Sequence, residues 1–207
     1  MKHNYLIYLL LFLAIIFRNN ILNIVNNFNQ MLFIRNNSLE MEMLKSEKLS
    51  LLKEYEELLD FKNNIKINTQ YTVTNVIKNS YGFNNLIING SNYKIGDEVV
   101  SIEGLVGVIS KLNHNTSEIK YIYNTNLVVK INDVTGKISG YDEENNIIIK
   151  EISNYNNIKI NDFVYSLYGT YIGKVIIIKY DILDSYLTIK PVNLHNLNYV
   201  AVLSRQI

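Results

Sequence analysis

Apolar and polar positions divide the 207-residue chain into three segments with different periodicities. An unbroken apolar run comes first, an apolar residue at every seventh position follows, and short alternating runs fill the remainder. These patterns are typical of a membrane-spanning helix, a coiled-coil helix and β-strands, respectively. The sequence therefore predicts a transmembrane helix within residues 1–25, a helical stalk over 26–68 and an all-β domain over 69–207.

The first segment contains thirteen consecutive apolar residues, Tyr5–Phe17. As a helix this run spans roughly 20 Å, which is short of the ~30 Å hydrocarbon core. Continued to Val25 it is long enough, provided that Arg18 extends to the membrane interface. Lys2 favours a cytoplasmic N-terminus, so we expect a single-pass anchor in the cell membrane with the β domain outside. The alternatives are a cleaved signal peptide, although no small-x-small site follows Ala14, and a buried helix.

A heptad repeat of apolar residues occupies the second segment, from Ser38 to Ile65. Glutamates fill the g positions, as is usual in coiled coils, and a lysine at one a position favours a low-order assembly. The repeat predicts a homodimer, and the alternative is an amphipathic helix lying on its own domain. The predicted dimer seam consists of Met41, Leu44, Lys48, Leu51, Tyr55, Leu58 and Ile65.

The third segment contains about ten short runs of β-branched and aromatic residues, separated by Asn, Gly and Asp. Such runs are typical of β-strands joined by turns. Their close spacing favours a sandwich or barrel over alternating strands and helices. We expect exposed strand edges to serve as contact surfaces.

One pattern occurs twice in this segment, at Lys94–Val108 and Lys159–Val175. The shared sequence is K-I-[GN]-D-x-V-x-S-x-x-G-x(2,3)-G-x-V, which reads as a turn, a half-buried strand, a second turn and a bulge. Two copies predict two small barrel-like subdomains of similar structure. The glycines expected at the turns and bulges are Gly96, Gly104, Gly107, Gly169 and Gly173.

Charge and composition exclude several classes of function. The net charge is +1, whereas a nucleic-acid-binding domain normally has a clear basic excess, so no nucleic acid partner is expected. The absence of Cys excludes disulfides, cysteine-ligated zinc and a thiol nucleophile. Three His and no phosphate-binding or metal-binding spacing give no reason to expect a cofactor or metal.

The order of these segments, and the residues of the β part, resemble the MreC family of rod shape-determining proteins. The strongest local similarity lies in Gly90–Lys111, followed by Ile158–Val175 and the closing stretch Ile189–Val202. The resemblance covers residues 71–207 in sequence and residues 1–70 in architecture only. One departure is a shorter loop after the second copy of the repeated strand.

The resemblance implies a non-enzymatic, membrane-anchored scaffold of the machinery that elongates the lateral cell wall. It implies dimerisation through the coiled coil, and it implies MreD, MreB and a penicillin-binding transpeptidase as partners. The alternative is an adaptor subunit of the membrane-fusion type in an efflux or secretion system. That architecture places strands before a helical hairpin, whereas this sequence has a single helical segment and no strand before it.

The resemblance also implies a β fold related to chymotrypsin-like barrels, which makes a catalytic triad one alternative. His114, then Asp133 or Asp142, then Ser166 have the required order. However, no Gly-x-Ser-x-Gly occurs, and Ser166 lies within a strand-like alternation. His195 is expected at or near the surface. The sequence therefore predicts no enzyme.

Overall fold

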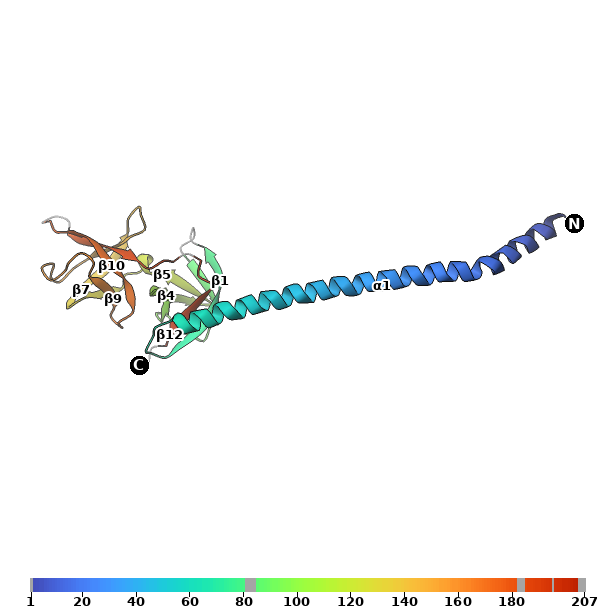
Figure 1. Ribbon diagram of the computed structural model, residues 1–207. Helices are drawn as coiled ribbons and strands as arrows, with labels where there is room; N and C mark the ends of the chain where they lie inside the picture. The colour runs from blue at the N-terminus through green and yellow to red at the C-terminus, as the bar shows by residue number, and fades with distance from the viewer. Residues whose placement is uncertain (1, 81–84, 182–184, 195, 205–207) are drawn as a thin grey trace. The chain divides into compact units, whose positions relative to one another are not determined.

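The computed structural model describes residues 2–80, 85–181, 185–194 and 196–204. A long helix, α1 (Lys2–Asn64), comes first, and β-strands follow it (Figure 1). The elements after α1 are β1 (Tyr71–Ser80), β2 (Asn85–Asn89), β3 (Glu98–Val100), β4 (Leu105–Leu112), β5 (Thr116–Tyr121), a 3-10 helix η2 (Ile122–Asn124), β6 (Val128–Ile131), β7 (Val134–Tyr141), β8 (Ile147–Lys150), β9 (Phe163–Ser166), β10 (Tyr171–Lys179), β11 (Tyr186–Pro191) and β12 (Tyr199–Leu203).

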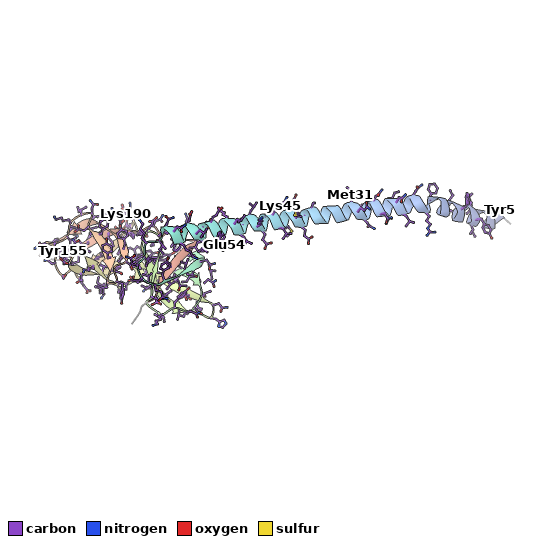
Figure 2. The ribbon with its side chains drawn as sticks, turned by 60° about the horizontal axis from the view of Figure 1, so that its bottom comes forward. Tyr5, Met31, Lys45, Glu54, Tyr155 and Lys190 are labelled. Carbon is purple, nitrogen blue, oxygen red and sulfur yellow. The ribbon has the colours of Figure 1, made fainter. Side chains whose placement is uncertain are left out.

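The helix α1 is continuous over 63 residues, because neither Gly nor Pro interrupts it. The chain divides into two compact units, residues 1–57 and 58–207, and α1 supplies all the helical structure of the first unit. Side chains such as Met31 and Lys45 project from it into open space (Figure 2). In the part of the chain that the structure describes, no helix meets the length and hydropathy required to cross a membrane.

The last turns of α1 belong to the second unit and are anchored there by Phe61. This side chain is only 8% exposed, and its ring centroid lies 6.3 Å from that of Tyr199 in β12. The helix ends at Asn64, although the amide of Ile65 still donates to the carbonyl of Phe61.

The described strands form two closed antiparallel barrels of six strands each. Barrel 1 has the order β1-β12-β3-β4-β5-β2, and barrel 2 has the order β10-β11-β8-β7-β6-β9. The prediction of an all-β domain with two barrels is confirmed. The expectation of exposed strand edges is wrong, because closure gives every described strand a neighbour on both sides.

The two barrels share one topology, with a single difference in chain order. In barrel 2, β6 lies between β7 and β9, and the six strands are consecutive in the chain. In barrel 1, the equivalent place between β1 and β3 is taken by β12, the last strand. Barrel 2 is therefore inserted between β5 and the strand that closes barrel 1.

Inward-facing side chains of both barrels form the hydrophobic core. Along β2 and β9 burial alternates residue by residue, as expected for strands with one face in a core. The largest fully buried side chains among the described residues are Tyr121, Leu86, Ile88, Leu105, Ile109, Ile119, Ile122, Ile131, Ile138, Ile147, Ile149 and Ile172.

The repeated sequence pattern makes the same hydrogen bonds in both barrels. A carboxylate oxygen of Asp97 accepts from the amide of Lys94 at 2.8 Å, and Asp162 accepts from Lys159 at 2.7 Å. After the strand, the amide of Ser101 donates to the carbonyl of Gly104, while the longer turn of barrel 2 closes from Ser166 to Thr170. The pattern thus occupies equivalent places before and after β3 and β9.

Two glycines of the pattern allow close approach of neighbouring strands. A Cβ atom added to Gly107 would lie 2.1 Å from the carbonyl oxygen of Lys120, and one on Gly173 would lie 2.1 Å from that of Lys190. Real Cβ atoms do not approach backbone oxygens this closely. A side chain at Gly107 would therefore push β4 away from β5, and one at Gly173 would push β10 away from β11.

We predict that Gly107→Ala and Gly173→Ala each lower the free energy of unfolding by about 2–3 kcal/mol, because the added methyl overpacks a strand pair. The matched control is Gly169→Ala. Its φ of 85° strains an alanine, but a Cβ there meets nothing within 4 Å, so about 1 kcal/mol is expected. Urea denaturation followed by circular dichroism measures all three. Equal effects at Gly107 and Gly169 would contradict the close-approach argument.

Candidate partner-binding surfaces

The repeated turns of the two barrels meet at the junction between them. The carboxylate of Glu98, in β3 of barrel 1, accepts a hydrogen bond of 2.5 Å from the hydroxyl of Thr170, in the turn before β10. A second carboxylate, that of Glu103, accepts from the backbone amide of Asn193 at 2.9 Å. Because Glu98 is only 3% exposed, its hydrogen bond is shielded from water and links the barrels firmly.

The backbone of Gly104 lies in the same junction. A Cβ atom at this position would lie 2.4 Å from the carbonyl oxygen of Tyr171 and 2.9 Å from a methyl group of Val192, both in barrel 2. The residue also has a φ of 150°, which side chains rarely adopt. The turn of barrel 1 therefore approaches barrel 2 closely only because this residue is a glycine.

A groove of about 900 Å³ lies beside the junction. Its walls come from three stretches of the second unit: the segment that follows α1, the β3–β4 turn and the β9–β10 turn. The lining residues are 65–70, Glu98, 100–104, Tyr165 and 168–171, together with Leu203 and Ser204. Across the residues that the structure describes, no three His, Asp or Glu side chains gather as a metal site would require.

Three aromatic side chains gather on the outer face of barrel 2, next to this groove. The ring centroids of Phe163, Tyr165 and Tyr171 lie 5.9–6.5 Å apart, and the amine of Lys174 lies 5.1 Å from the centroid of the Phe163 ring. Burial raises the pKa of the Tyr171 phenol, with a further contribution from Tyr165. Edge-to-face contacts between rings, and a cation over one of them, stabilise these side chains in place although they are partly exposed to solvent.

Six of the seven predicted seam residues lie on α1, and their side chains are exposed up to Tyr55. Leu58, one heptad beyond Leu51, is half-buried. The last seam residue, Ile65, lies past the end of α1, packs against the β core and lines the groove. The exposed seam residues are Met41, Leu44, Lys48, Leu51 and Tyr55.

The remaining predicted glycines lie at turns. Gly96 has a φ of 89°, and its equivalent in barrel 2, Asn161, has a φ of 73°. Gly169 lies at the tip of the β9–β10 turn, where its amide donates to the carbonyl of Ser166. Both copies of the pattern therefore use the left-handed backbone region at the same position before the strand.

The residues of the considered triad have separate structural surroundings. His114 lies in the β4–β5 turn of barrel 1, whereas Asp133 lies in the β6–β7 turn of barrel 2. The hydroxyl of Ser166 is buried and accepts from the amides of Tyr168 and Thr170, so it serves its own turn. His195 lies outside the described residues.

The hairpin carboxylate of Asp142 also has a local role. Desolvation opposes its ionisation, but hydrogen bonds from the side chain and backbone of Asn146 and the backbone of Glu144 together lower its pKa. A carboxylate that closes a tight turn in this way is a structural group. Asp142 therefore gives no support to acid–base chemistry.

Sequence reasoning missed the contacts that build the junction. Phe61 occupies a g position of the heptad pattern, outside the predicted seam. An apolar residue at that position was the sequence feature that could have indicated packing of the helix end on the β domain. Thr170 and Glu98 had no signal, because they come from different barrels and lie 72 residues apart in the chain.

A sequence profile described as "Rod shape-determining protein MreC, barrel core" matches residues 76–204, which is more than half of the chain. No curated protein matches the sequence.

Several solved structures are similar. A major periplasmic domain of the cell shape-determining filament MreC is 19% identical and has a TM-score of 0.59, with 66% of this chain and 99% of that chain covered. MreC from Pseudomonas aeruginosa is 15% identical, with a TM-score of 0.56 and 65% and 99% covered. A third similar structure is a complex between penicillin-binding protein PBP2 and MreC from Helicobacter pylori. Its sequence identity is 18% and its TM-score is 0.54, with 66% of this chain and 99% of that chain covered. At these identities the likeness shows the fold.

We predict that Thr170→Val lowers the free energy of unfolding by about 2 kcal/mol, because a buried carboxylate loses a donor. The control Thr72→Val, at an exposed position of β1, should change it by less than about 0.5 kcal/mol. Replacing both partners, Thr170→Val with Glu98→Leu, should recover part of the loss. Thermal unfolding measures these three variants and the single variant Glu98→Leu. If the two groups do not interact, the loss of unfolding free energy in the double variant will equal the sum of the losses in Thr170→Val and Glu98→Leu. That result would contradict the hydrogen bond's contribution to stability.

Proposed function

This chain belongs to the MreC family of rod shape-determining proteins, and from that membership we propose that it is a non-enzymatic, membrane-anchored scaffold of the lateral wall elongation machinery. The observation that carries the proposal is the match of the barrel core to residues 76–204, which contain both closed barrels apart from the start of β1. The family consists of cell-shape determinants and is not known for catalysis. Because the chain belongs to the MreC family, we prefer the scaffold to the alternative of a membrane-fusion adaptor.

We assign three functional parts to the chain. Residues 1–25 form the cytoplasmic end and the membrane anchor, residues 26–68 form the stalk, and residues 69–207 form the β domain outside the membrane. The anchor is supported by the apolar run Tyr5–Phe17 and by the absence of acidic residues before Ser38. The location of the β domain is supported by the likeness to a periplasmic domain.

The stalk is proposed to form a homodimer. Its support is the regular placement of apolar side chains such as Leu44 and Leu51 on a helix whose described side chains are all exposed up to Glu56. A long helix of this kind gains its stability from packing of an apolar stripe, and a second copy supplies the same stripe. The i, i+4 ion pair between Lys53 and Glu57 adds little, because both groups are exposed.

The β domain is proposed to present its surfaces to wall-synthesis partners. A penicillin-binding transpeptidase is supported by the complex between PBP2 and MreC from Helicobacter pylori. MreD and MreB are partners on the basis of the family resemblance. The membrane itself is a further partner, through the proposed anchor.

The first test concerns the seam. Leu44→Glu with Leu51→Glu places charges on the shared face, so the full chain in detergent should change from dimer to monomer in light scattering. The matched control Ser46→Glu with Leu49→Glu adds the same charge at outer positions of the same turns and should leave the dimer intact. A monomeric parent chain, or dimerisation of the seam variant, would refute the coiled coil.

The second test concerns the function in the cell. Depletion of the chain from a rod-shaped host should round or widen the cells, and the full chain should restore their shape. A chain in which a cleavable export signal replaces residues 1–25 should be released from the membrane fraction and fail to restore shape. Normal rods after complete depletion would contradict the proposed function, and full rescue by the released chain would contradict the anchor.

A further inference from the structure

The heptad phase of the seam can be followed along α1 toward the N-terminus. Because the helix is continuous, the a position of Met41 and the d position of Leu44 can be counted back in steps of seven residues. The first step reaches Ile34 and Asn37, and the next two steps reach only residues with side-chain amides. These residues, which we call the amide stripe, are Asn20, Asn23, Asn27 and Gln30, and their side chains are exposed.

The stripe lies on the side of the helix that carries the seam. A straight α-helix drifts by roughly 20° per heptad relative to an exact seven-residue repeat, which amounts to about 60° over the three heptads between Asn20 and Met41. The stripe therefore faces within the same half of the helix even without supercoiling. A second copy that packs on the seam is thus aligned to meet the stripe as well.

The opposite face of the same stretch is apolar. Val25, Phe28 and Met31 occupy outer heptad positions, and their side chains are exposed. Residues 19–34 contain no charged side chain. Amides therefore lie on the contact side of the helix, and large apolar groups lie on the outside.

This arrangement is the inverse of the one in the stalk. Between Met41 and Tyr55 apolar residues dominate the seam, whereas charged residues such as Glu42, Lys53 and Glu56 take outer positions. A helix pair in water buries apolar side chains and exposes charged ones. In a bilayer the preference is reversed, because lipid solvates apolar side chains and polar groups are satisfied between helices. The inverted pattern thus indicates that residues 19–31 pair in contact with lipid.

A helix lying flat on the membrane surface could also present one apolar face and one polar face. Such helices typically carry Lys and Arg on the polar face, where these residues meet anionic headgroups. The amide stripe has none, and the nearest basic residues are Arg18 and Arg35. Moreover, neither Gly nor Pro occurs in α1 to turn a surface helix into an upright stalk (Figure 1).

We propose that the amide stripe is a membrane-level contact between two copies of this chain, in which side-chain amides hydrogen-bond across the helix pair. This contact rests on the anchor and the homodimer proposed above, and it adds the way in which they pair. Each amide supplies a donor and an acceptor, so the same residue in two parallel copies can satisfy itself. A shift of one copy along the other would set amides against apolar side chains, so the stripe fixes a parallel, in-register pair.

Disulfide cross-linking tests which face forms the contact. The chain contains no Cys, so a single introduced cysteine reports only its own position. In the full chain in lipid vesicles, Asn23→Cys and Asn27→Cys should each give covalent dimers on oxidation with copper phenanthroline. The matched controls Val25→Cys and Phe28→Cys lie on the outer face and should cross-link at least about tenfold more slowly, because their Cα atoms are beyond the reach of a disulfide.

A leucine variant tests the surroundings of the stripe, because lipid and water predict opposite signs. In lipid, Asn23→Leu with Asn27→Leu removes hydrogen bonds and gains no apolar contact that lipid does not already supply, so dimerisation should weaken about tenfold. In water, leucines at a and d positions would strengthen it. Energy transfer between labelled full chains, over a series of protein-to-lipid ratios, measures the change. The control Asn29→Leu, at an outer position, should change it less than about twofold.

Four results would overturn the proposal, and they separate its failure from that of the homodimer. Cross-linking at Leu44→Cys and Leu51→Cys, without cross-linking at the stripe, would refute the stripe and leave the stalk dimer intact. Equal cross-linking at stripe and outer positions would refute the assigned face. Stronger dimerisation of the leucine variant would place the stripe in water. Absence of cross-linking at the stripe and at the stalk would refute the homodimer as well.

Discussion

The pairing of β12 between β1 and β3 is the contact on which the rest of the β domain depends. Through it, the last described strand closes the barrel that the first strand begins. Val200, Ala201 and Val202 are buried in that closed barrel, so the pairing also completes its core. Because β12 follows barrel 2 in the chain, both ends of barrel 2 are tied to barrel 1. The junction bonds of Glu98 and Glu103 can then form between two bodies already held together.

In barrel 1, β12 occupies the place that β6 occupies in barrel 2, and the repeated turn differs between the barrels as a result. In barrel 2, the side-chain amide of Asn132, directly after β6, donates to Asp162 at 2.9 Å. In barrel 1, register places Leu203, the last residue of β12, at the equivalent position. Oδ2 of Asp97 therefore accepts from the amide of Lys94, whereas Oδ2 of Asp162 accepts both from the amide of Lys159 and from Asn132. Among the described residues, Oδ1 of Asp97 is buried and has no hydrogen-bond partner. The aspartate of the repeated turn is thus held by one more hydrogen bond in barrel 2 than in barrel 1.

Local patterns in the sequence predicted the elements, but they did not predict how distant strands pair. The heptad repeat and the alternating runs depend on neighbouring residues, so a helix followed by strands was predictable, and so was the turn chemistry at Gly96 and Asn161. Barrel closure depends on pairs such as Thr72 with Val202, which lie 130 residues apart and carry no local signal. For the same reason the strands were expected to have free edges. Ile65 fitted the heptad spacing, yet the helix ends before it and the β core binds it instead.

The most direct measurement of the account is hydrogen–deuterium exchange on a chain that ends at Asn198 and so lacks β12. Barrel 2 closes with its own consecutive strands, whereas barrel 1 cannot close without the last one. Relative to the full chain, amides of β1–β5 should therefore lose protection, while amides of β6–β11 should keep it. Retained protection across β1–β5 would contradict the account, because barrel 1 would then be stable without the strand assigned to close it.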